Sequence, residues 1–366
     1  MSGARYAAFV VSHPYVDALA CFREPIRALA DAGWHVDLYT TISSLHGAPV
    51  FAHDRIRVVP IEMTPAGTLQ MISRLVTHRP RYRWLFAPPQ WSLYYGGIAA
   101  RLAGIGLVCI SDELTSEAEA RTPLEKQWKA RERRAHQRCA FTIALSDERG
   151  AYIREENHLG PDHLIFTVPN SAPGPAVRLR SHYYQDILDL DADRFVVLHS
   201  GSWWWRLQFA SISDVVKDWD EDTVLVFQGR LMNHLGDDAP HAKMRVSPAI
   251  LPSALLDYAT SSAHVGLALY AATTANHAQV GTASGKIALY MKNVLPVITT
   301  RQPSLEWVEQ DGCGVCIDDL REIAGAVRRI RSRYDEYCAN VRRVYDERWN
   351  FTRAFAPVLA RVERGR

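Results

Sequence analysis

The stretch of sequence that decides the fold is Gly281-Thr-Ala-Ser-Gly-Lys-Ile-Ala-Leu-Tyr-Met-Lys-Asn-Val-Leu-Pro-Val-Ile-Thr-Thr300. Small residues lead into a helix that is expected to begin near Ser284, and the apolar run Leu295–Thr299 follows as a buried parallel strand. Small residues before a helix let backbone N–H groups approach an anion, and Lys286 adds a full charge to the helix dipole. Ser284, Gly285 and Lys286 therefore predict a phosphate site.

A nucleotide-hydrolase P-loop does not fit this stretch. Only three residues separate Gly281 from the Gly285-Lys286 pair, where the P-loop pattern needs four, and Ile287 stands in place of its Ser or Thr. The competing interpretation is that Ser284 is only a helix cap and Lys286 a solvated charge.

Composition predicts a globular protein of two domains. The chain has 366 residues, 48% hydrophobic and 22% charged, which is too long for one ordinary core. A formal net charge of +2 argues against a dedicated nucleic-acid partner. The N-terminus shows no signal-peptide pattern, so we expect a cytoplasmic protein. Cys313 and Cys316 have CxxC spacing without further ligands, so we expect reduced thiols and no metal.

Apolar runs typical of buried strands alternate with helical patterns along the chain. In the first half the expected strands are Tyr6–Ser12, His35–Thr40, Ile56–Ile61, Trp84–Ala87, Leu107–Ser111, Phe141–Ser146 and Leu164–Val168. Prolines and a glycine interrupt the pattern in Val168-Pro-Asn-Ser-Ala-Pro-Gly-Pro175, which indicates a domain boundary. The expected strands of the second half are Phe195–His199, Thr223–Phe227, His264–Leu269, Leu295–Thr299 and Gly314–Ile317.

This alternation predicts an α/β fold of two doubly wound, Rossmann-like domains facing a cleft, with ligands beyond the carboxyl ends of the strands. We place the first domain at residues 1–175 and the second at residues 176–345. Residues 346–366 are predicted to form a C-terminal helix whose apolar face packs back on the first domain.

Five segments, in this order, resemble the nucleotide-sugar glycosyltransferases of the two-Rossmann-domain (GT-B) type across nearly the whole chain. The segments are Val168–Ser171, Val197–Ser202, Leu251–Val265, Ser284–Val297 and Gly312–Ile317. The sequence is most similar to bacterial family 4 (group 1) enzymes, which carry a Ser-x-Lys-x-x-x-Tyr segment. The resemblance implies a UDP- or GDP-linked sugar donor and no cofactor.

The resemblance also identifies candidate donor contacts. The large retaining families have two glutamates eight positions apart, but Gly281 and Leu289 occupy the matching positions here. We expect Asn276, which precedes the Ser-x-Lys segment, or the three successive tryptophans 203–205 to take that role. Gly201, Ser202 and Arg206, after the first strand of the second domain, are similar to a glycine and basic residue that related enzymes place against the diphosphate. Arg206 is alternatively a surface charge.

The catalytic base is expected on the first domain. Asp112 and Glu113 follow one strand, and His13 follows another, so each is a candidate for accepting the proton of an acceptor hydroxyl. A cap or a surface charge is the alternative role for each.

The segment Arg74–Trp84 mixes cations with aromatic residues, as membrane-surface segments do. It predicts peripheral contact with the inner face of a membrane and a glycan or lipid-linked acceptor. A solvated face is the alternative.

Together these features predict a metal-independent, hexosyltransferase-like glycosyltransferase of glycan, polysaccharide or glycolipid biosynthesis. Two alternatives stay open. One is a nucleotide-sugar epimerase of the same architecture, and the other is a catalytically silent protein that binds a donor or a partner.

Overall fold

The computed structural model describes residues 4–43, 47–201, 210–229, 241–249 and 251–365. The chain divides into two compact units. Unit 1 comprises Met1–Pro173, Thr274–Ala283 and Phe351–Arg366, and unit 2 comprises Gly174–Thr273 and Ser284–Asn350. The ten residues Thr274–Ala283 thus belong to unit 1, although the sequence on either side of them belongs to unit 2.

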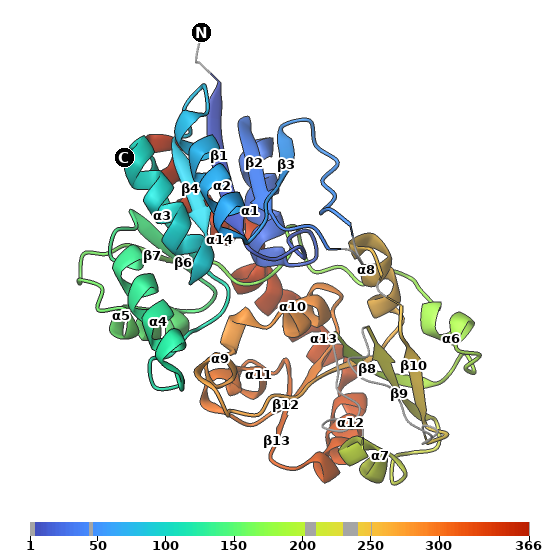
Figure 1. Cartoon of the computed structure of the whole chain (residues 1–366). Coiled ribbons are helices and arrows are strands. Elements are labelled where there is room, and N and C mark those ends of the chain that lie inside the picture. The colour runs from blue at the N-terminus through green and yellow to red at the C-terminus, as the bar shows by residue number, and fades with distance from the viewer. Residues whose placement is uncertain (1–3, 44–46, 202–209, 230–240, 250, 366) are drawn as a thin grey trace. The chain divides into compact units, whose positions relative to one another are not determined.

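Within the described residues, unit 1 contains a seven-stranded parallel sheet of order β3-β2-β1-β4-β5-β6-β7 (Figure 1). Its strands are β1 (Arg5–Val11), β2 (Trp34–Thr40), β3 (Ile56–Pro60), β4 (Trp84–Ala87), β5 (Gly106–Ser111), β6 (Phe141–Ala144) and β7 (Ile165–Thr167). Its helices are α1 (Ala20–Asp31), α2 (Pro65–Thr77), α3 (Trp91–Ala103), α4 (Pro123–His136), α5 (Asp147–Glu156), α9 (Ala275–Ala278), the 3-10 turn η2 (Gly281–Ala283) and α14 (Phe351–Arg364).

Helices cover both faces of this sheet, which explains the continuous apolar runs of its strands. Successive side chains of a strand point to opposite faces. Phe9 of β1 packs in one core cluster with residues of α1 and α14, whereas Ala8 and Val10 pack in a second cluster with residues of α2 and α3. The side chains from Ala7 to Val11 of β1 therefore all lie in a core, where an unpaired polar side chain would be unfavourable.

The C-terminal helix α14 packs on unit 1, as predicted. Phe351, Phe355, Val358 and Val362 form one buried face at helical spacing and join the core cluster of β1. The indole Nε1 of Trp84 donates a hydrogen bond of 3.0 Å to the carbonyl of Val362. In Figure 1 the red C-terminal segment accordingly lies among the blue and cyan elements of unit 1.

Unit 2 has its own parallel sheet, six-stranded over the described residues and of order β10-β9-β8-β11-β12-β13. Its strands are β8 (Phe195–Ser200), β9 (Thr223–Gln228), β10 (Met244–Ser247), β11 (Val265–Ala268), β12 (Val297–Thr300) and β13 (Gly314–Ile317). Its helices are α6 (Tyr183–Ile187), α7 (Ala210–Val216), α8 (Ser253–Ser261), α10 (Gly285–Lys292), η3 (Pro303–Leu305), α11 (Trp307–Gln310), η4 (Leu320–Glu322), α12 (Ile323–Ser332), α13 (Tyr334–Val344) and the π-helical turn η5 (Tyr345–Trp349).

Two details of unit 2 differ from the prediction. The sequence analysis missed β10, because this edge strand carries Arg245 and lacks a continuous apolar run. Strand β12 begins at Val297, two residues later than expected, because Val294 has a φ of +60° and turns the chain just before it. The fold class is nevertheless the predicted one, with two parallel α/β sheets.

The basic segment Arg74–Trp84 differs from the membrane-surface pattern. Tyr82 and Trp84 are buried, whereas Arg74, Arg79, Arg81 and Arg83 are exposed. The segment lies between the end of α2 and the start of β4, at the amino edge of the sheet. No helix among the described residues is long and apolar enough to cross a bilayer.

Replacing Phe355 by Ala should lower the free energy of unfolding by about 3 to 5 kcal/mol, because the buried ring leaves a cavity in the core of unit 1. Chemical denaturation measures this. Arg353→Ala, an exposed position on the same helix, is the control and should change stability by less than about 0.5 kcal/mol. Equal stabilities of the two variants would contradict the packing of α14.

Candidate functional site

The carboxyl edge of the first sheet carries the candidate proton acceptors. Strand order reverses between β1 and β4, and ligands of doubly wound folds bind beyond the strand ends at such a point. His13 follows β1, Gln90 follows β4, and Asp112 follows β5. Gln90 has a φ of +61°, a strained conformation for a residue with a side chain, and such strain is concentrated at functional sites. The predicted base candidates thus lie on loops at one edge.

Burial lowers the pKa of His13, which favours the neutral form of its imidazole. Its ring lies edge-on against Phe22, with ring centroids 5.4 Å apart. Neither ring nitrogen has a hydrogen-bond partner within the described part of the chain, although both nitrogens are buried. A neutral ring in this state can accept a proton.

Asp112 and Glu113 have raised pKa values. Desolvation, followed by the charge of Glu113, raises the pKa of Asp112 to about 7, and Arg149 opposes this rise. Desolvation also raises the pKa of Glu113, against the charges of Arg149 and His277 and a hydrogen bond with Asn276. A carboxyl group with a pKa near neutrality is matched to general base or acid work, so Asp112 is better suited to this chemistry than an ordinary surface carboxylate.

Asn276 lies in unit 1 beside these carboxyl groups. Its Oδ1 accepts hydrogen bonds from the Leu114 amide at 3.2 Å and from Arg149 Nη2 at 2.7 Å. Its side chain also hydrogen-bonds Glu113. The donor contact that the sequence analysis assigned to Asn276 stays a prediction. Its present contacts hold the loop that follows β5.

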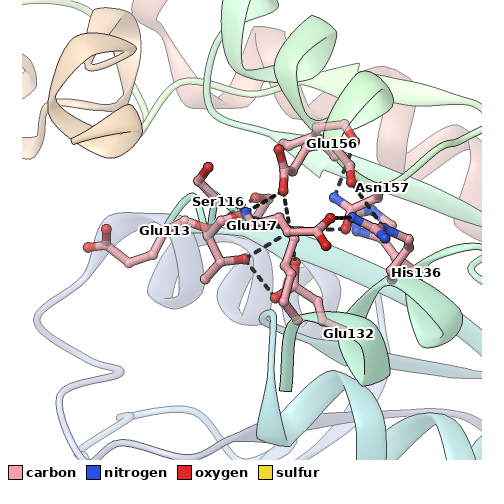
Figure 2. Close-up of polar contacts among 12 residues, drawn as sticks. Glu113, Ser116, Glu117, Glu132, His136, Glu156 and Asn157 are labelled. Carbon is pink, nitrogen blue, oxygen red and sulfur yellow. Dashed lines mark hydrogen bonds and ion pairs between the residues drawn. The ribbon is translucent and has the colours of Figure 1, made fainter. Parts of the chain in front are cut away.

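A buried polar cluster contacts the same loop, and Figure 2 shows its polar contacts, with Glu132, Glu156 and Asn157 among the labelled residues. Lys129 on α4 is only 4% exposed, and its ammonium donates to the Thr115 carbonyl at 2.6 Å, to Glu132 at 2.9 Å and to Asn157 at 3.2 Å. Glu156 accepts from the Glu117 amide at 2.6 Å. The cluster fixes the β5–α4 loop and hence the carboxyl groups at its start.

In unit 2 two glycines shape the carboxyl edge of the sheet. Gly201 follows β8 with a φ of +117°, and Gly229 follows β9 with a φ of +127°. A Cβ on Gly229 would lie 2.5 Å from the carbonyl oxygen of Gly201, so the two loops touch backbone to backbone. Strand order reverses between β8 and β11, next to Gly201. The predicted glycine thus lies at the switch point of the second sheet.

Lys286 lies in the first turn of α10, and its side chain packs against Gly201. A Cβ on Gly201 would lie 3.2 Å from Lys286 Cε, so the glycine leaves room for the lysine side chain. The ammonium lies 3.4 Å from Nε2 of the buried His199 and 5.6 Å above the ring of Tyr270. Desolvation lowers the pKa of Lys286 to about 8, and no described carboxylate compensates for it. The ammonium is therefore still charged at neutral pH and has no anionic partner within the described chain.

The start of α10 leaves backbone donors beside this ammonium. Ser284 caps the helix, because its Oγ accepts from the Ile287 amide at 3.0 Å. Gly285 is exposed, so the amides of the first turn are accessible. Tyr290 fixes the helix to the sheet: its hydroxyl accepts from the Ser200 amide at 2.7 Å and donates to the Leu267 carbonyl at 3.1 Å. The helix start and the Lys286 ammonium thus lie close together, and the anion site expected from the sequence stays a prediction.

Some of the predicted site residues are not described by the structure, and some residues near the candidate sites were not predicted. Ser202, Arg206 and the tryptophans 203–205 lie outside the described residues. Sequence reasoning missed His199, Tyr270 and Arg149, since a histidine or tyrosine at a strand end and an arginine in a helix carry no local signal of their partners. No group of three or more His, Cys, Asp or Glu residues suited to a metal ion lies among the described residues.

Comparisons with known proteins find a family model for part of the chain and solved structures with a similar fold. Residues 207–348 match the family model described as glucosyltransferase 3-like, C-terminal domain. The chain superposes on sucrose-phosphate synthase from Thermosynechococcus elongatus with a TM-score of 0.70, 16% identity and 98% of both chains covered. Anabaena HepE, solved with UDP and glucose, gives a TM-score of 0.71 at 13% identity over 98% of this chain and 99% of that one.

A UDP-N-acetylglucosamine 2-epimerase is also similar, with a TM-score of 0.58 and 13% identity over 93% of this chain and 91% of that one. No curated protein matches the sequence. At these identities the likeness shows the fold. The chain has the GT-B fold, as the sequence resemblance predicted.

Binding of UDP should weaken as the pH rises from 7.5 to 9. Desolvation lowers the pKa of Lys286 to about 8, so the positive charge expected to attract a diphosphate is lost as the pH rises through this range. Calorimetric titration across this range measures the effect. Lys286→Met should bind weakly with no such pH dependence, and at pH 7 it should unfold no more easily than the wild type, because the cost of desolvating the ammonium is gone. An unchanged pH dependence in Lys286→Met would contradict the assignment.

Proposed function

We propose that this chain is a glycosyltransferase that moves a sugar from a nucleoside diphosphosugar to an acceptor hydroxyl. The observation that carries the proposal is the Lys286 ammonium, which lies over Gly201 at the start of α10. A departing diphosphate gains negative charge as the bond to the sugar breaks. A desolvated cation and accessible backbone amides stabilise that charge. In this scheme the protein supplies the positive charge, so the leaving group needs no metal.

The donor we propose is a UDP-linked hexose, with a GDP-linked sugar as the alternative. Anabaena HepE, which has the same fold, was solved in complex with UDP-glucose, and this supports UDP. The match of residues 207–348 to a glucosyltransferase C-terminal domain supports a hexose and covers α10 with Lys286. Unit 2 is therefore the donor side of the proposal.

Unit 1 is the acceptor side, and Asp112 is the general base. The acceptor oxygen attacks the sugar carbon, the bond from that carbon to the diphosphate breaks, and the hydroxyl proton passes to the Asp112 carboxylate. The pKa of about 7 supports this role, because a base works best when its pKa is close to the operating pH. His13 and Glu113 are the alternative bases. Burial lowers the pKa of His13 and raises that of Glu113.

For the acceptor we propose a glycan or a lipid-linked glycan, made into polysaccharide or glycolipid at the cytoplasmic face of a membrane. The exposed arginines of Arg74–Trp84 would contact anionic headgroups by charge alone, since Tyr82 and Trp84 are in the core. Such contact would weaken steeply with salt.

A nucleotide-sugar epimerase is the second candidate, because a UDP-N-acetylglucosamine 2-epimerase has the same fold. An epimerase interconverts the donor sugar without any acceptor. Incubation of the protein with UDP-sugars alone, followed by chromatography of the sugar, separates the two. A new UDP-sugar epimer favours the epimerase, sugar transfer to an added acceptor favours the transferase, and tight UDP binding without turnover favours the silent protein.

Asp112→Asn should lower the transfer rate by about 100-fold or more and leave the affinity for UDP unchanged, since the base is lost and the donor side is intact. In the wild type the rate should fall as the pH drops below about 7, where Asp112 becomes protonated. Glu113→Gln is the matched control on the same loop and should lower the rate less. A larger loss in Glu113→Gln, or in His13→Gln, would transfer the role of base to that residue.

A further inference from the structure

The segment Thr274–Ala283, which we call the strap, is fixed to unit 1 by specific hydrogen bonds. Thr282 Oγ1 donates to the Leu145 carbonyl at 2.5 Å. Asn170 donates from its backbone amide to the Thr282 carbonyl at 3.1 Å and from Nδ2 to the Ala283 carbonyl at 3.1 Å. The strap lies between β11 and α10 in sequence, so these bonds bring residues from far along the chain to the acceptor-side loops.

Arg149, in the first turn of α5, holds the middle of the strap. Its side chain is buried, with 2% of its surface exposed. Nε donates to the Gln279 carbonyl at 2.8 Å, and Nη2 donates to the Asn276 carbonyl at 3.0 Å and to Asn276 Oδ1 at 2.7 Å. Nη1 donates to the Asp112 carbonyl at 2.9 Å. One guanidinium therefore joins the strap to the loop that carries Asp112.

This use of arginine is specific to its geometry. The guanidinium is a rigid planar fork with five donors, so it can bind several carbonyl oxygens in fixed directions at once. A lysine ammonium in its place could satisfy only part of these acceptors. The fork also orients Asn276, whose side chain meets both Glu113 and the Leu114 amide.

We propose that Arg149 is a positioning residue for the acceptor side, which fixes the strap against the β5–α4 loop so that Asn276 holds Glu113 and Asp112 keeps its place for the reaction. The proposal rests on the proposed function, because it concerns the same carboxyl groups. It adds a role for the strap and for Arg149, which contacts neither substrate in this scheme.

The charges around the two carboxyl groups give the proposal a distinctive readout. Asp112 is flanked by Glu113 on its own loop, by Arg149 on α5 and by the thiol of Cys21 on α1. Glu113 is flanked by Arg149, by His277 on α9 and by the Asn276 amide. Arg149 lowers the pKa of both carboxyl groups. Removing its charge should therefore raise both pKa values.

The test compares Arg149→Met with Arg154→Met. Arg154 lies on the same helix and also binds carbonyl oxygens, those of Pro161 at 3.3 Å and His163 at 3.0 Å, away from the β5–α4 loop. Arg149→Met should lower kcat by about 10- to 100-fold, because a small displacement of reacting groups has that cost. The acid limb of its pH–rate profile should move up by about one pH unit or more. Its affinity for UDP should stay within about threefold, and Arg154→Met should keep the wild-type values.

Carbon-13 NMR titration of the Asp and Glu carboxyl groups tests the proposal without any turnover. Asp112 and Glu113 should titrate at higher pH in Arg149→Met than in the wild type. If the protein fails to bind UDP, the proposed function falls, whereas an upward shift of these carboxyl titrations still supports the role of Arg149 in positioning them.

Two results would overturn the proposal. One is a wild-type kcat and pH profile in a folded Arg149→Met variant. The other is a lower kcat with an unmoved acid limb and unmoved carboxyl titrations, which would show a merely structural role. Should Arg149→Met not fold, Arg149→Lys should retain most of the pKa values and lose part of kcat. Asn276→Ala should then raise the pKa of Glu113 alone, and an unmoved Glu113 titration would equally count against the proposal.

Discussion

The proposed donor side depends on one constraint, which is that a desolvated ammonium group must stay charged at the end of a buried strand. Lys286 reaches this position only because Gly201 has no side chain to block it. Burial of an ammonium is unfavourable, and it lowers the pKa of Lys286 to about 8 instead of being offset by a carboxylate. His199 beside it is also desolvated, which lowers its pKa and leaves a neutral ring that can accept from the ammonium. The site is thus prepared for an anion from outside.

Other buried cations in the chain serve as structural supports, and the contrast defines the site. Lys129 has a carboxylate, a carbonyl and an amide oxygen around it, and Arg149 binds carbonyls of two separate segments. Both stabilise loops, because their charges are already met by protein acceptors. Lys286 differs in having only a neutral imidazole and an aromatic ring as described contacts. Burial alone therefore does not distinguish a cation that could bind a ligand from one that stabilises the fold. The hydrogen-bond partners of the cation make that distinction.

The sequence predicted the parts of this protein that depend on local pattern. Continuous apolar runs identified most strands because both sheet faces are covered, and β10 escaped because it is a short edge strand. The start of α10 at Ser284 was predicted because a helix-capping serine, a glycine and a lysine lie next to one another in sequence, and the structure shows this cap. Pairings between distant segments could not be predicted. Nothing near Arg149 in sequence indicates that it binds Asn276, 127 positions away.

The same limitation explains Asn276. Its position before the Ser-x-Lys segment predicts a donor contact, which stays a prediction, and nothing in that position indicates the hydrogen bonds from Asn170 and Arg149 that hold the strap in unit 1. A local motif locates a residue along the chain, but its tertiary hydrogen bonds determine which unit it packs in.

The central claim is that Lys286 binds the diphosphate of the donor. Titration calorimetry of UDP with Lys286→Ala at pH 7 tests it most directly, with Lys292→Ala at the other end of α10 as the control for loss of a charge on the same helix. The account predicts that binding weakens by about 1.5 to 3 kcal/mol in Lys286→Ala, as expected for a lost charge-assisted hydrogen bond, and stays near wild type in Lys292→Ala. Wild-type affinity in a folded Lys286→Ala variant would contradict it.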